Sequence, residues 1–477
     1  MQNIIKKLPY KKMHFVGIKG IAMANLAIMV NQEGIGVTGT DVEEEFVTDS
    51  FLRRAGISWN VGFSPRNIPD ACDLVVVTGA HGGMTNPEAQ AAKERGFRVV
   101  TQAQALGLFM EGFRGISVCG CHGKTTTSAM LATVLDRSGK HPSFLVGSAT
   151  IAALQQAARF DGRGEFFVAE ADEYLSCPMT DRTPKFLYQH PEIIIATNIE
   201  YDHPDAYASL DDIKKAYKTF FQSVPSGGML FGCSESPEIL SLFHSLSGYP
   251  QTTYGTEHSD SVRVSNVRLL EGETAFSVTK GKTSEDFRLR VPGMHNVLNA
   301  TAVVAVGLHL DLSLVDIKRG LFDYTGTTRR FEFIAECNGR LLYDDYAHHP
   351  TEIRSTLQAA RSWFGKRRIV CIFQPHTYSR TKALFTEFVQ AFSSADVVIL
   401  TDIYASKREG KDTSVSSALL VQEMKIVHPN VRLISDKKDV PSFLATYTKS
   451  SDVVITMGAG DIYHLHPRIL EEIQHHG

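Results

Sequence analysis

The stretch Gly115-Ile-Ser-Val-Cys-Gly-Cys-His-Gly-Lys-Thr-Thr-Thr127 joins a short apolar run to a segment with helical character. The run from Ile116 to Cys119 predicts a buried strand, and the residues from Thr126 to Ser138 predict a helix. Between them lies a glycine turn with little side-chain bulk, followed by Lys124 and Thr125. Strand, glycine turn, Lys-Thr and helix follow one another in the order that a phosphate-binding loop requires.

The chemistry of this turn suits a nucleotide triphosphate. Glycines let backbone N–H groups approach phosphate oxygens, and the helix N-terminus adds partial positive charge. Lys124 can reach a β- or γ-phosphate, and the Thr125 hydroxyl can hold Mg²⁺. The loop is short, because Val118 stands where the longer pattern has glycine, so an ordinary strand-to-helix turn is the alternative. The residues predicted to contact ATP here are Gly120, Cys121, His122, Gly123, Lys124, Thr125 and Thr126.

Length and composition limit the class of protein. A chain of 477 residues suggests about three domains, and 43% hydrophobic with 21% charged residues is ordinary globular composition. The net charge of −3 gives no reason to expect a nucleic-acid or membrane partner. No apolar segment approaches the ~20 residues of a membrane helix, and the N-terminus lacks the apolar region of a secretory signal. Seven cysteines without a CxxC pair predict reduced core thiols, and we expect a cytoplasmic protein.

The N-terminal region resembles the start of a Rossmann-type unit. Met13 begins a predicted strand that leads through Gly17-x-x-Gly20 into a helix, and a second strand ends at Asp41. In such a unit the glycines lie beneath a pyrophosphate, and the acid accepts a hydrogen bond from a ribose hydroxyl. The spacing G-x-x-G is weaker than G-x-G-x-x-G, so glycines used for packing alone are the alternative.

Two strands after the phosphate loop end in acids or histidine. The apolar run from Phe166 leads to three candidate Mg²⁺ ligands, and the run from Ile193 leads to Asn198, Asp202 and His203. Because ligands bind at the carboxyl ends of the strands in an α/β sheet, these side chains are expected near the triphosphate. The three acids are Glu170, Asp172 and Glu173.

The last third of the chain repeats the order of strand, polar tip and helix. One strand ends at Asp344 and Asp345, just before His348 and His349, and another ends at His376 with Arg380 close behind. The pair Arg329-Arg330 precedes this region, and His295 and Asn296 lie at the head of an earlier predicted helix, where an amide could contact a base. The repeated order predicts a further doubly wound α/β unit.

Together these segments predict an α/β protein of three domains. The expected domains are a Rossmann-like N-terminal domain over residues 1–111, a central P-loop ATPase-like domain over 112–326 and a C-terminal Rossmann-like domain over 327–477.

The complete set of motifs closely resembles one family, the Mur ligases, which are ATP-dependent amide-forming ligases of peptidoglycan precursor synthesis. The resemblance covers essentially the whole chain and is specific as a set. The motifs that carry it are the N-terminal GxxG, GCHGKTTT, EADEY, TNIEYDH, GMHNVLNATA, RRFE, DDYAHHPTE, FQPHTYSRT and GAGDI.

The resemblance implies a role for each matching residue. Gly17, Gly20 and Asp41 would hold the UDP part of a sugar nucleotide. Lys124 would contact the ATP phosphates, Thr125 and Glu170 would hold one Mg²⁺, and His203 with Glu170 would hold a second. The remaining implied contacts are Asn296 to adenine, Arg330 and Asp345 to ATP phosphate and ribose, and His348, His376 and Arg380 to the amino acid or the lactyl carboxylate.

The implied activity is ATP-dependent joining of L-alanine to the lactyl carboxylate of UDP-N-acetylmuramate, through an acyl phosphate, in cell-wall synthesis. DDYAHHPTE with FQPHTYSRT most resembles the members with this substrate pair. Three alternatives stay open: a ligase that attaches a murein tripeptide to the same nucleotide sugar, a non-catalytic sensor of nucleotide sugars, and an ATPase that moves another protein. We expect a monomer or a weak homodimer.

Three features depart from the family pattern. Cys121 stands where the family usually has Thr, and Thr377 stands where many members have Arg. The stretch 174–185 is longer and more polar than the L-alanine pattern, and its Asp-Arg before Lys-Phe is similar to the tripeptide ligase. These departures leave the identity of the amino substrate open.

Overall fold

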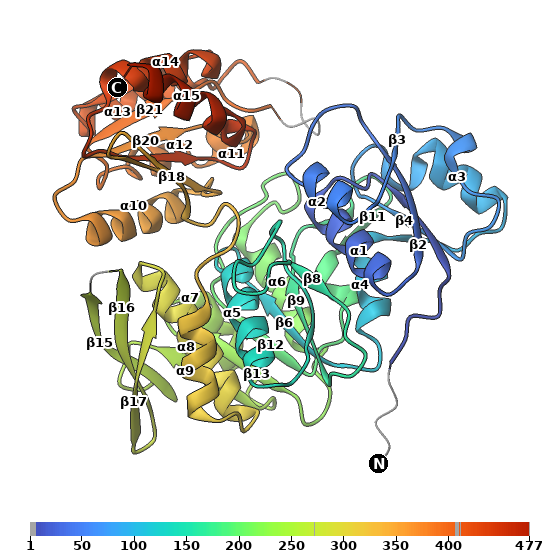
Figure 1. The fold of residues 1–477 in the computed structure, drawn as a ribbon. Helices are drawn as coiled ribbons and strands as arrows, with labels where there is room; N and C mark the ends of the chain where they lie inside the picture. The colour runs from blue at the N-terminus through green and yellow to red at the C-terminus, as the bar shows by residue number, and fades with distance from the viewer. Residues whose placement is uncertain (1–5, 271, 406–409, 411, 477) are drawn as a thin grey trace.

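The protein folds into three α/β domains. The computed structural model describes residues 6–270, 272–405, 410 and 412–476. Figure 1 shows the N-terminal domain in blue on the right, the central domain in cyan to yellow below, and the C-terminal domain in orange to red at the upper left. Each domain has its own sheet, so the predicted three-domain α/β fold is confirmed.

The N-terminal domain is a five-stranded parallel sheet in the order β3-β2-β1-β4-β5, which is a Rossmann-type topology. Its central strand β4 is wholly apolar and buried, and β1 is buried apart from Lys12 at its start, as strands covered on both faces require. The strands are β1 (Lys12–Val16), β2 (Gly36–Asp41), β3 (Asn60–Val61), β4 (Leu74–Val77) and β5 (Val99–Thr101). The helices are α1 (Ile21–Gln32), α2 (Asp49–Arg54), α3 (Pro87–Glu94) and α4 (Gln102–Met110).

The central domain is built on a ten-stranded sheet in the order β17-β16-β15-β14-β13-β12-β6-β9-β7-β8. Its strands are β6 (Arg114–Cys119), β7 (Ser143–Leu145), β8 (Ala158–Arg159), β9 (Phe166–Ala171), β12 (Ile193–Ala196), β13 (Met229–Cys233), β14 (Gln251–Gly255), β15 (Val262–Leu270), β16 (Glu273–Lys280) and β17 (Thr283–Leu289). A separate hairpin is formed by β10 (Leu175–Cys177) and β11 (Asp181–Pro184). The helices are α5 (Lys124–Arg137), α6 (Leu210–Phe221), α7 (Pro237–Ser245), α8 (Met294–His309) and α9 (Leu314–Asp323).

The C-terminal domain has a six-stranded sheet in the order β18-β19-β23-β20-β21-β22, parallel except for the edge strand β18. The strands are β18 (Glu332–Cys337), β19 (Arg340–Asp345), β20 (Ile369–Phe373), β21 (Val397–Leu400), β22 (Val431–Leu433) and β23 (Val453–Met457). The helices are α10 (Pro350–Phe364), α11 (Tyr378–Ala383), α12 (Phe385–Val389), α13 (Ser417–Val427), α14 (Val440–Tyr447) and α15 (His466–His476).

The helix after the phosphate loop begins two residues earlier than the sequence pattern predicts. It starts at Lys124 rather than Thr126, because Gly123 takes a left-handed conformation (φ +84°) that turns the chain directly into the helix. The alternating segments within residues 261–279 form β15 and β16, which pair antiparallel with each other and, through β17, form one edge of the central sheet.

The segment that joins the central and C-terminal domains is tightly constrained. Thr327 pairs with both Ile151 and Arg330 in isolated bridges, and Arg329 and Phe331 have positive φ angles of 61° and 50°. Arg329 crosses into the C-terminal domain, where its Nε lies 2.8 Å from Asp344 Oδ2. The connection is therefore short and braced rather than an extended linker.

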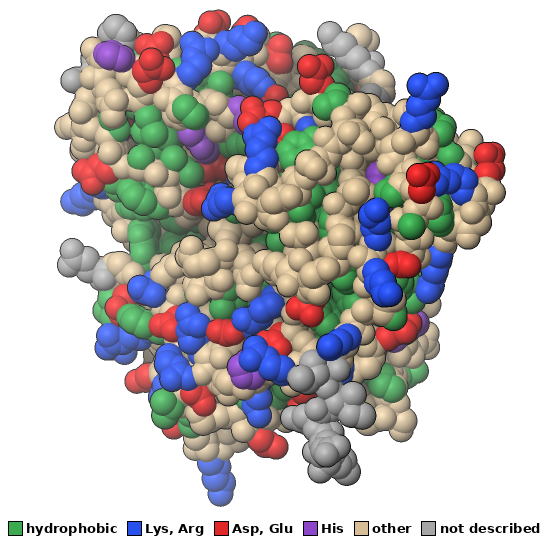
Figure 2. All heavy atoms as spheres, turned by 45° about the vertical axis from the view of Figure 1, so that its right-hand side comes forward, with side chains coloured by type: hydrophobic (Ala, Val, Ile, Leu, Met, Phe, Trp, Pro, Cys, Tyr) green, Lys and Arg blue, Asp and Glu red, His purple; other side chains and the backbone are tan. Residues whose placement is uncertain are grey.

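The surface and the thiols agree with the composition. On the face drawn in Figure 2, basic and acidic side chains are interspersed. All seven cysteines lie in the described part of the chain and are free thiols, and Cys72 is the one among them that is not buried. Among the described residues, no helix is long and apolar enough to cross a membrane.

Candidate active site

The phosphate loop lies between β6 and α5, and neighbouring strands and helices pack closely on it. A Cβ atom at Gly120 would lie 2.1 Å from Thr197 Oγ1, and one at Gly123 would lie 2.7 Å from Asn299 Oδ1. Both positions also have positive φ angles. Glycine is therefore required at both ends of the turn by its conformation and by its neighbours.

Lys124 is paired with an acid from the next strand of the sheet. Its Nζ lies 2.9 Å from Glu173 Oε2; the Glu173 side chain is buried, and that of Lys124 is 14% exposed. Burial opposes the charge on the lysine, but Glu173 and Asp172 raise the Lys124 pKa above its usual range. The ammonium group is therefore held charged where β9 ends.

Two groups of side chains near the carboxyl end of β9 could hold a divalent cation. Ligand atoms of Asp172, Glu173 and His203 lie within 4.8 Å of one another, which suits a cation with mixed oxygen and nitrogen ligands. The second group pairs Glu170 with Thr125, whose hydroxyl interacts with the Glu170 carboxyl. His203 Nε2 lies 3.3 Å from Glu173 Oε1 and 3.7 Å from Asp202 Oδ2. A cation held by His203 together with Glu170, as the resemblance implies, stays a prediction.

A cavity of about 860 Å³ collects most of the predicted residues. It is lined by all three domains, and the Glu170 carboxyl in it has a pKa raised by burial. The predicted residues among its lining are Gly20, Cys121, Gly123, Lys124, Thr125, Glu170, Asp172, Glu173, Asp202, His203, Arg329, Arg330, His348, His376 and Arg380.

A second cavity of about 110 Å³ lies on the other side of the phosphate loop. Gly123, Arg330 and Glu352 line both cavities, so the two meet at the loop. The predicted residues in this second cavity are His122, Gly123, Thr126, Asn198, His295, Asn296, Arg330 and Asp345. The arrangement suits a base and ribose in the smaller space and phosphates across the loop.

The groups around the smaller cavity are held by local contacts. Asn296 Nδ2 donates to the carbonyl of Pro292 over 2.7 Å, which fixes the amide at the start of α8. Asp345 accepts hydrogen bonds from the backbone N–H groups of Phe331 (2.7 Å) and Ala347 (2.8 Å). Burial raises the pKa of the Asp345 carboxyl to about 6, although Arg330 opposes the shift.

The C-terminal domain brings two histidines and an arginine to the larger cavity. The rings of His348 and His376 are 6.2 Å apart, and Arg380 donates to Asp202 Oδ1 of the central domain through Nε (3.1 Å) and Nη2 (3.0 Å). His348 Nδ1 lies 2.9 Å from the carbonyl of Tyr346. Because a carbonyl only accepts, Nδ1 carries the hydrogen and Nε2 is the basic nitrogen. Burial lowers the His348 pKa to about 4, so the ring is neutral at pH 7.

The three predicted residues of the N-terminal domain have different surroundings. Gly20 lines the larger cavity, whereas Gly17 packs against Thr78 and Asp41 is 1% exposed. Asp41 accepts hydrogen bonds from the backbone N–H groups of Lys19 and Val42, both over 2.7 Å, and so braces the glycine turn. A ribose contact by Asp41 stays a prediction.

Sequence reasoning missed residues that reach the site from other elements. Glu352 of α10 lies 3.2 Å from His122 and 3.5 Å from Arg330. Lys185 directly follows β11, and its Nζ donates to Asp172 Oδ2 over 2.6 Å. Glu352 lies in the quoted motif DDYAHHPTE, and that placement was the available signal.

The fold and the site together define a three-domain α/β protein with a P-loop in its central domain, facing acids, histidines and arginines from its neighbours. The chain belongs to the Mur ligase family. Its three segments match the models described as "Mur ligase family, catalytic domain" (residues 12–114), "Mur ligase middle domain" (118–307) and "Mur ligase, glutamate ligase domain" (329–460).

Individual relatives cover nearly the whole chain. The UDP-N-acetylmuramate–L-alanine ligase of Desulfitobacterium hafniense is 40% identical over 94% of this chain and 97% of its own. The crystal structure of UDP-N-acetylmuramate-alanine ligase from Thermotoga maritima has a TM-score of 0.80 at 28% identity, covering 97% of this chain and 99% of that one. A murein peptide ligase from Psychrobacter arcticus has a TM-score of 0.71 at 25% identity, with the same coverage.

Proposed function

We propose that this chain joins L-alanine to the lactyl carboxylate of UDP-N-acetylmuramate, with cleavage of ATP to ADP and phosphate. The observation that carries this proposal is the pair of cavities that meet at the phosphate loop, with Lys124 and the acids of β9 on one side and cationic and imidazole groups of the C-terminal domain on the other. The identity of 40% with a relative named for this activity supports the choice of substrates.

The first step activates a poor electrophile. A lactyl carboxylate oxygen attacks the γ-phosphorus, the bond from this phosphorus to the β–γ bridging oxygen breaks, and ADP leaves an acyl phosphate. Lys124 would stabilise charge on the β- and γ-phosphates, and Arg330 lies where the two cavities meet to do the same. Asn296 would hold the adenine in the smaller cavity, and Asp345 the ribose.

The residues present fit Mg²⁺. Thr125 with Glu170, and Asp172 and Glu173 with His203, offer oxygen and nitrogen ligands beside the phosphate loop. Bound Mg²⁺ would offset the negative charge that the carboxylate and the triphosphate bring together.

The second step forms the amide. The free amine attacks the acyl carbon, phosphate leaves with the C–O bond, and the amine loses a proton. His348 would accept that proton at Nε2, because its Nδ1 hydrogen is engaged by the Tyr346 carbonyl. Arg380, oriented by Asp202, would hold a carboxylate near His376. Gly17, Gly20 and Asp41 would position the UDP group from the N-terminal domain.

A murein tripeptide is the second candidate for the amine. The observation that favours it is the polar hairpin β10–β11 with Lys185, together with the similarity to a murein peptide ligase. L-alanine is preferred, because the relative with 40% identity is named for it.

The proposal is tested by phosphate release from ATP with UDP-N-acetylmuramate and Mg²⁺, adding L-alanine, glycine, L-serine or murein tripeptide in turn, with mass spectrometry of the products. We expect release that depends on L-alanine and a product heavier by one alanyl residue. Release with tripeptide alone would select the second candidate. Measurable binding of ATP and sugar nucleotide without release for any amine would contradict a ligase and favour a sensor.

Two lysine variants, measured in the same assay, test the role of Lys124. Lys124→Ala is expected to lower turnover by at least about 100-fold, the scale of losing a charged group that stabilises a transition state. Lys140→Ala, at an exposed lysine just after α5, should leave turnover unchanged. Near-normal ADP production by Lys124→Ala, in protein whose circular dichroism matches wild type, would remove Lys124 from the mechanism.

A further inference from the structure

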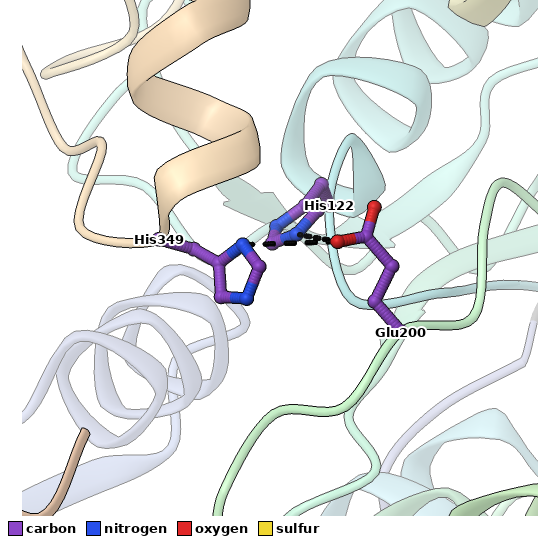
Figure 3. A group of neighbouring side chains, drawn as sticks. All are labelled: His122, Glu200 and His349. Carbon is purple, nitrogen blue, oxygen red and sulfur yellow. Dashed lines mark ion pairs between the residues drawn. The ribbon is translucent and has the colours of Figure 1, made fainter. Parts of the chain in front are cut away.

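The ring of His122 points away from the phosphate loop toward the C-terminal domain. Its backbone is fixed by Asn198, which accepts from the His122 N–H through Oδ1 and donates to the His122 carbonyl through Nδ2, both over 2.9 Å. The ring lies near Glu200 of the central domain and His349 at the start of α10, as Figure 3 shows. The backbone of His122 is therefore part of the phosphate loop, whereas its ring lies at the boundary between the central and C-terminal domains.

His122 lies between two carboxylates from different domains. Its Nδ1 is 3.2 Å from Glu352 Oε1, and its Nε2 is 3.7 Å from Glu200 Oε2. Burial opposes a charge on His122, but Glu352 and Glu200 raise its pKa to about 10. One imidazolium cation thus lies between two carboxylates, one on each side of the boundary, and we call His122, Glu200 and Glu352 the clasp.

Glu352 connects the clasp to groups of the proposed site. Its carboxylate lies 3.3 Å from His348 Nδ1 and 3.5 Å from Arg330 Nη1. It also accepts a hydrogen bond from the His348 backbone N–H over 3.0 Å. A displacement of Glu352 would therefore move the proposed base and a phosphate-facing arginine together.

Glu200 and the Nδ1 atom of His349 have protein partners, whereas His349 Nε2 has no hydrogen-bond partner among the described residues. Thr351 donates through Oγ1 to Glu200 Oε2 over 2.8 Å, and its backbone N–H donates to His349 Nδ1 over 3.3 Å. Although His122, Glu200 and His349 are close enough to hold a cation, the His349 nitrogen nearest to Glu200 is already an acceptor. The geometry favours an ion-paired contact between domains over a metal centre.

We propose that His122 and Glu352 are positioning residues: their ion pair docks the C-terminal domain on the phosphate loop and so places His348 and Arg330 against the reacting groups. This inference rests on the proposed function for its effect on catalysis. The docking itself does not depend on turnover, because the paired residues belong to the two domains whatever the substrate is. In the docked protein, removal of the His122 ring leaves the buried Glu352 carboxylate with Arg330 but without the imidazolium, and a buried charge that loses a partner is costly.

The test is a double-mutant cycle with His122→Gln, Glu352→Gln and the double variant, measured in the L-alanine assay. Each single variant is expected to lower kcat by about tenfold or more, the scale of coupling between charged residues in contact. The KM for the sugar nucleotide should change less than about twofold, since its predicted site lies in the N-terminal domain. The double variant should be about as slow as the slower single variant.

Controls use the same substitutions at exposed sites. His244→Gln on α7 and Glu336→Gln on β18 remove one exposed imidazole and one exposed carboxylate, and neither lies at the clasp. Both should leave kcat and KM unchanged. Losses that multiply in the double clasp variant, to about 100-fold, would show that the residues act independently and would overturn the proposal.

Small-angle scattering of the ligand-free proteins separates this inference from the proposed function. If wild type has no turnover with any amine, the proposed function fails. The docking role of the clasp is then tested by the radius of gyration alone. We expect a larger radius of gyration for either clasp variant than for wild type and both controls. An unchanged radius in both clasp variants would overturn docking by this pair. A rise in melting temperature with ZnCl₂ that is lost in Glu200→Gln would make the cluster a metal site and would also overturn it.

Discussion

At the scale of single residues, buried charges of the site are paired with opposite charges from another element. Lys124 lies against Glu173, and Arg380 of the C-terminal domain lies against Asp202 of the central domain. Such pairs add little net stability, because removing two ions from water costs about as much as their attraction returns. Their value is in fixing where charges lie, which is what transfer of a phosphoryl group needs.

The clasp makes stability depend on pH in a defined direction. The pKa of His122 is about 10 in the folded protein, against an ordinary value of 6.5, because Glu352 and Glu200 outweigh the effect of burial. Its contribution to the free energy of unfolding is therefore fully present below pH 6.5 and is lost as pH rises through 10. The other ionisable neighbour, His349, has a pKa lowered to about 4 by burial and stays neutral over this range.

The measurement is the melting temperature of wild type and His122→Gln at pH 6.5, 8 and 10.5 by calorimetry. At pH 6.5 the melting temperature of wild type should be higher than that of His122→Gln. This difference in melting temperature should shrink steadily as the pH rises to 10.5. A difference that stays constant over this range would mean that His122 is not charged in the folded protein. His244→Gln, at an exposed histidine, should parallel wild type throughout.

Some site residues follow from the sequence and others do not. Lys124, Thr125 and the acids after Phe166 could be predicted, because each follows a strand directly and local order fixes which edge of the sheet it reaches. The partners of His122 could not, since Glu352 lies 230 residues further along and meets it only when two domains dock. A sequence pattern contains no information on that docking.

At the scale of elements, the hairpin β10–β11 of the central domain contacts the loop after β4. A Cβ atom at Gly83 would lie 2.1 Å from Cys177 Sγ, and one at Gly79 would lie 2.5 Å from the Ser176 carbonyl oxygen. Ser176 Oγ also donates to Thr101 Oγ1 over 2.8 Å. The hairpin therefore holds the N-terminal domain against the central one.

Gly83→Ala tests this contact, with Gly96→Ala as its control. Both glycines have positive φ angles, +53° and +79°, so both variants carry the cost of a left-handed alanine. Only Gly83 has a neighbour in the way, because nothing lies within 4 Å of a Cβ at Gly96. We expect Gly83→Ala to lose about 1–3 kcal/mol more in the free energy of unfolding, as overpacking does. Equal losses in denaturant titrations would show that the hairpin contact is loose.

Buried apolar strands were more predictable than polar ones. The strands β9 and β12 could be predicted because each contains four consecutive buried apolar residues. The hairpin was not found, since β10 has three residues and β11 is polar and only partly buried. Strands of this kind are defined by their neighbours rather than by their own composition.

At the scale of the whole molecule, the larger cavity is shared by all three domains. Gly20 comes from the first, Lys124 from the second and His348 from the third. The number of domains could be predicted from chain length, but their arrangement could not, because contacts such as Arg380 to Asp202 join residues 178 positions apart. A site assembled in this way excludes water only while the domains are together.

Ligands that contact several domains should therefore make the protein more compact. We expect the radius of gyration from small-angle scattering to fall when a non-hydrolysable ATP analogue and UDP-N-acetylmuramate are added together, and less with either alone. The reason is that each ligand supplies contacts to only part of the shared cavity. No change with both ligands at saturating concentration would contradict closure.

The distribution of the thiols bears on how such movement can be followed. Six of the seven cysteines are buried, and Cys72, just before β4, is partly exposed. A maleimide fluorophore added to the native protein is therefore expected to react first at Cys72 on the N-terminal domain, since the other thiols are buried. Cys72 thus provides one labelling site for distance measurements by fluorescence energy transfer. Only a second labelling site, on the C-terminal domain, has to be engineered.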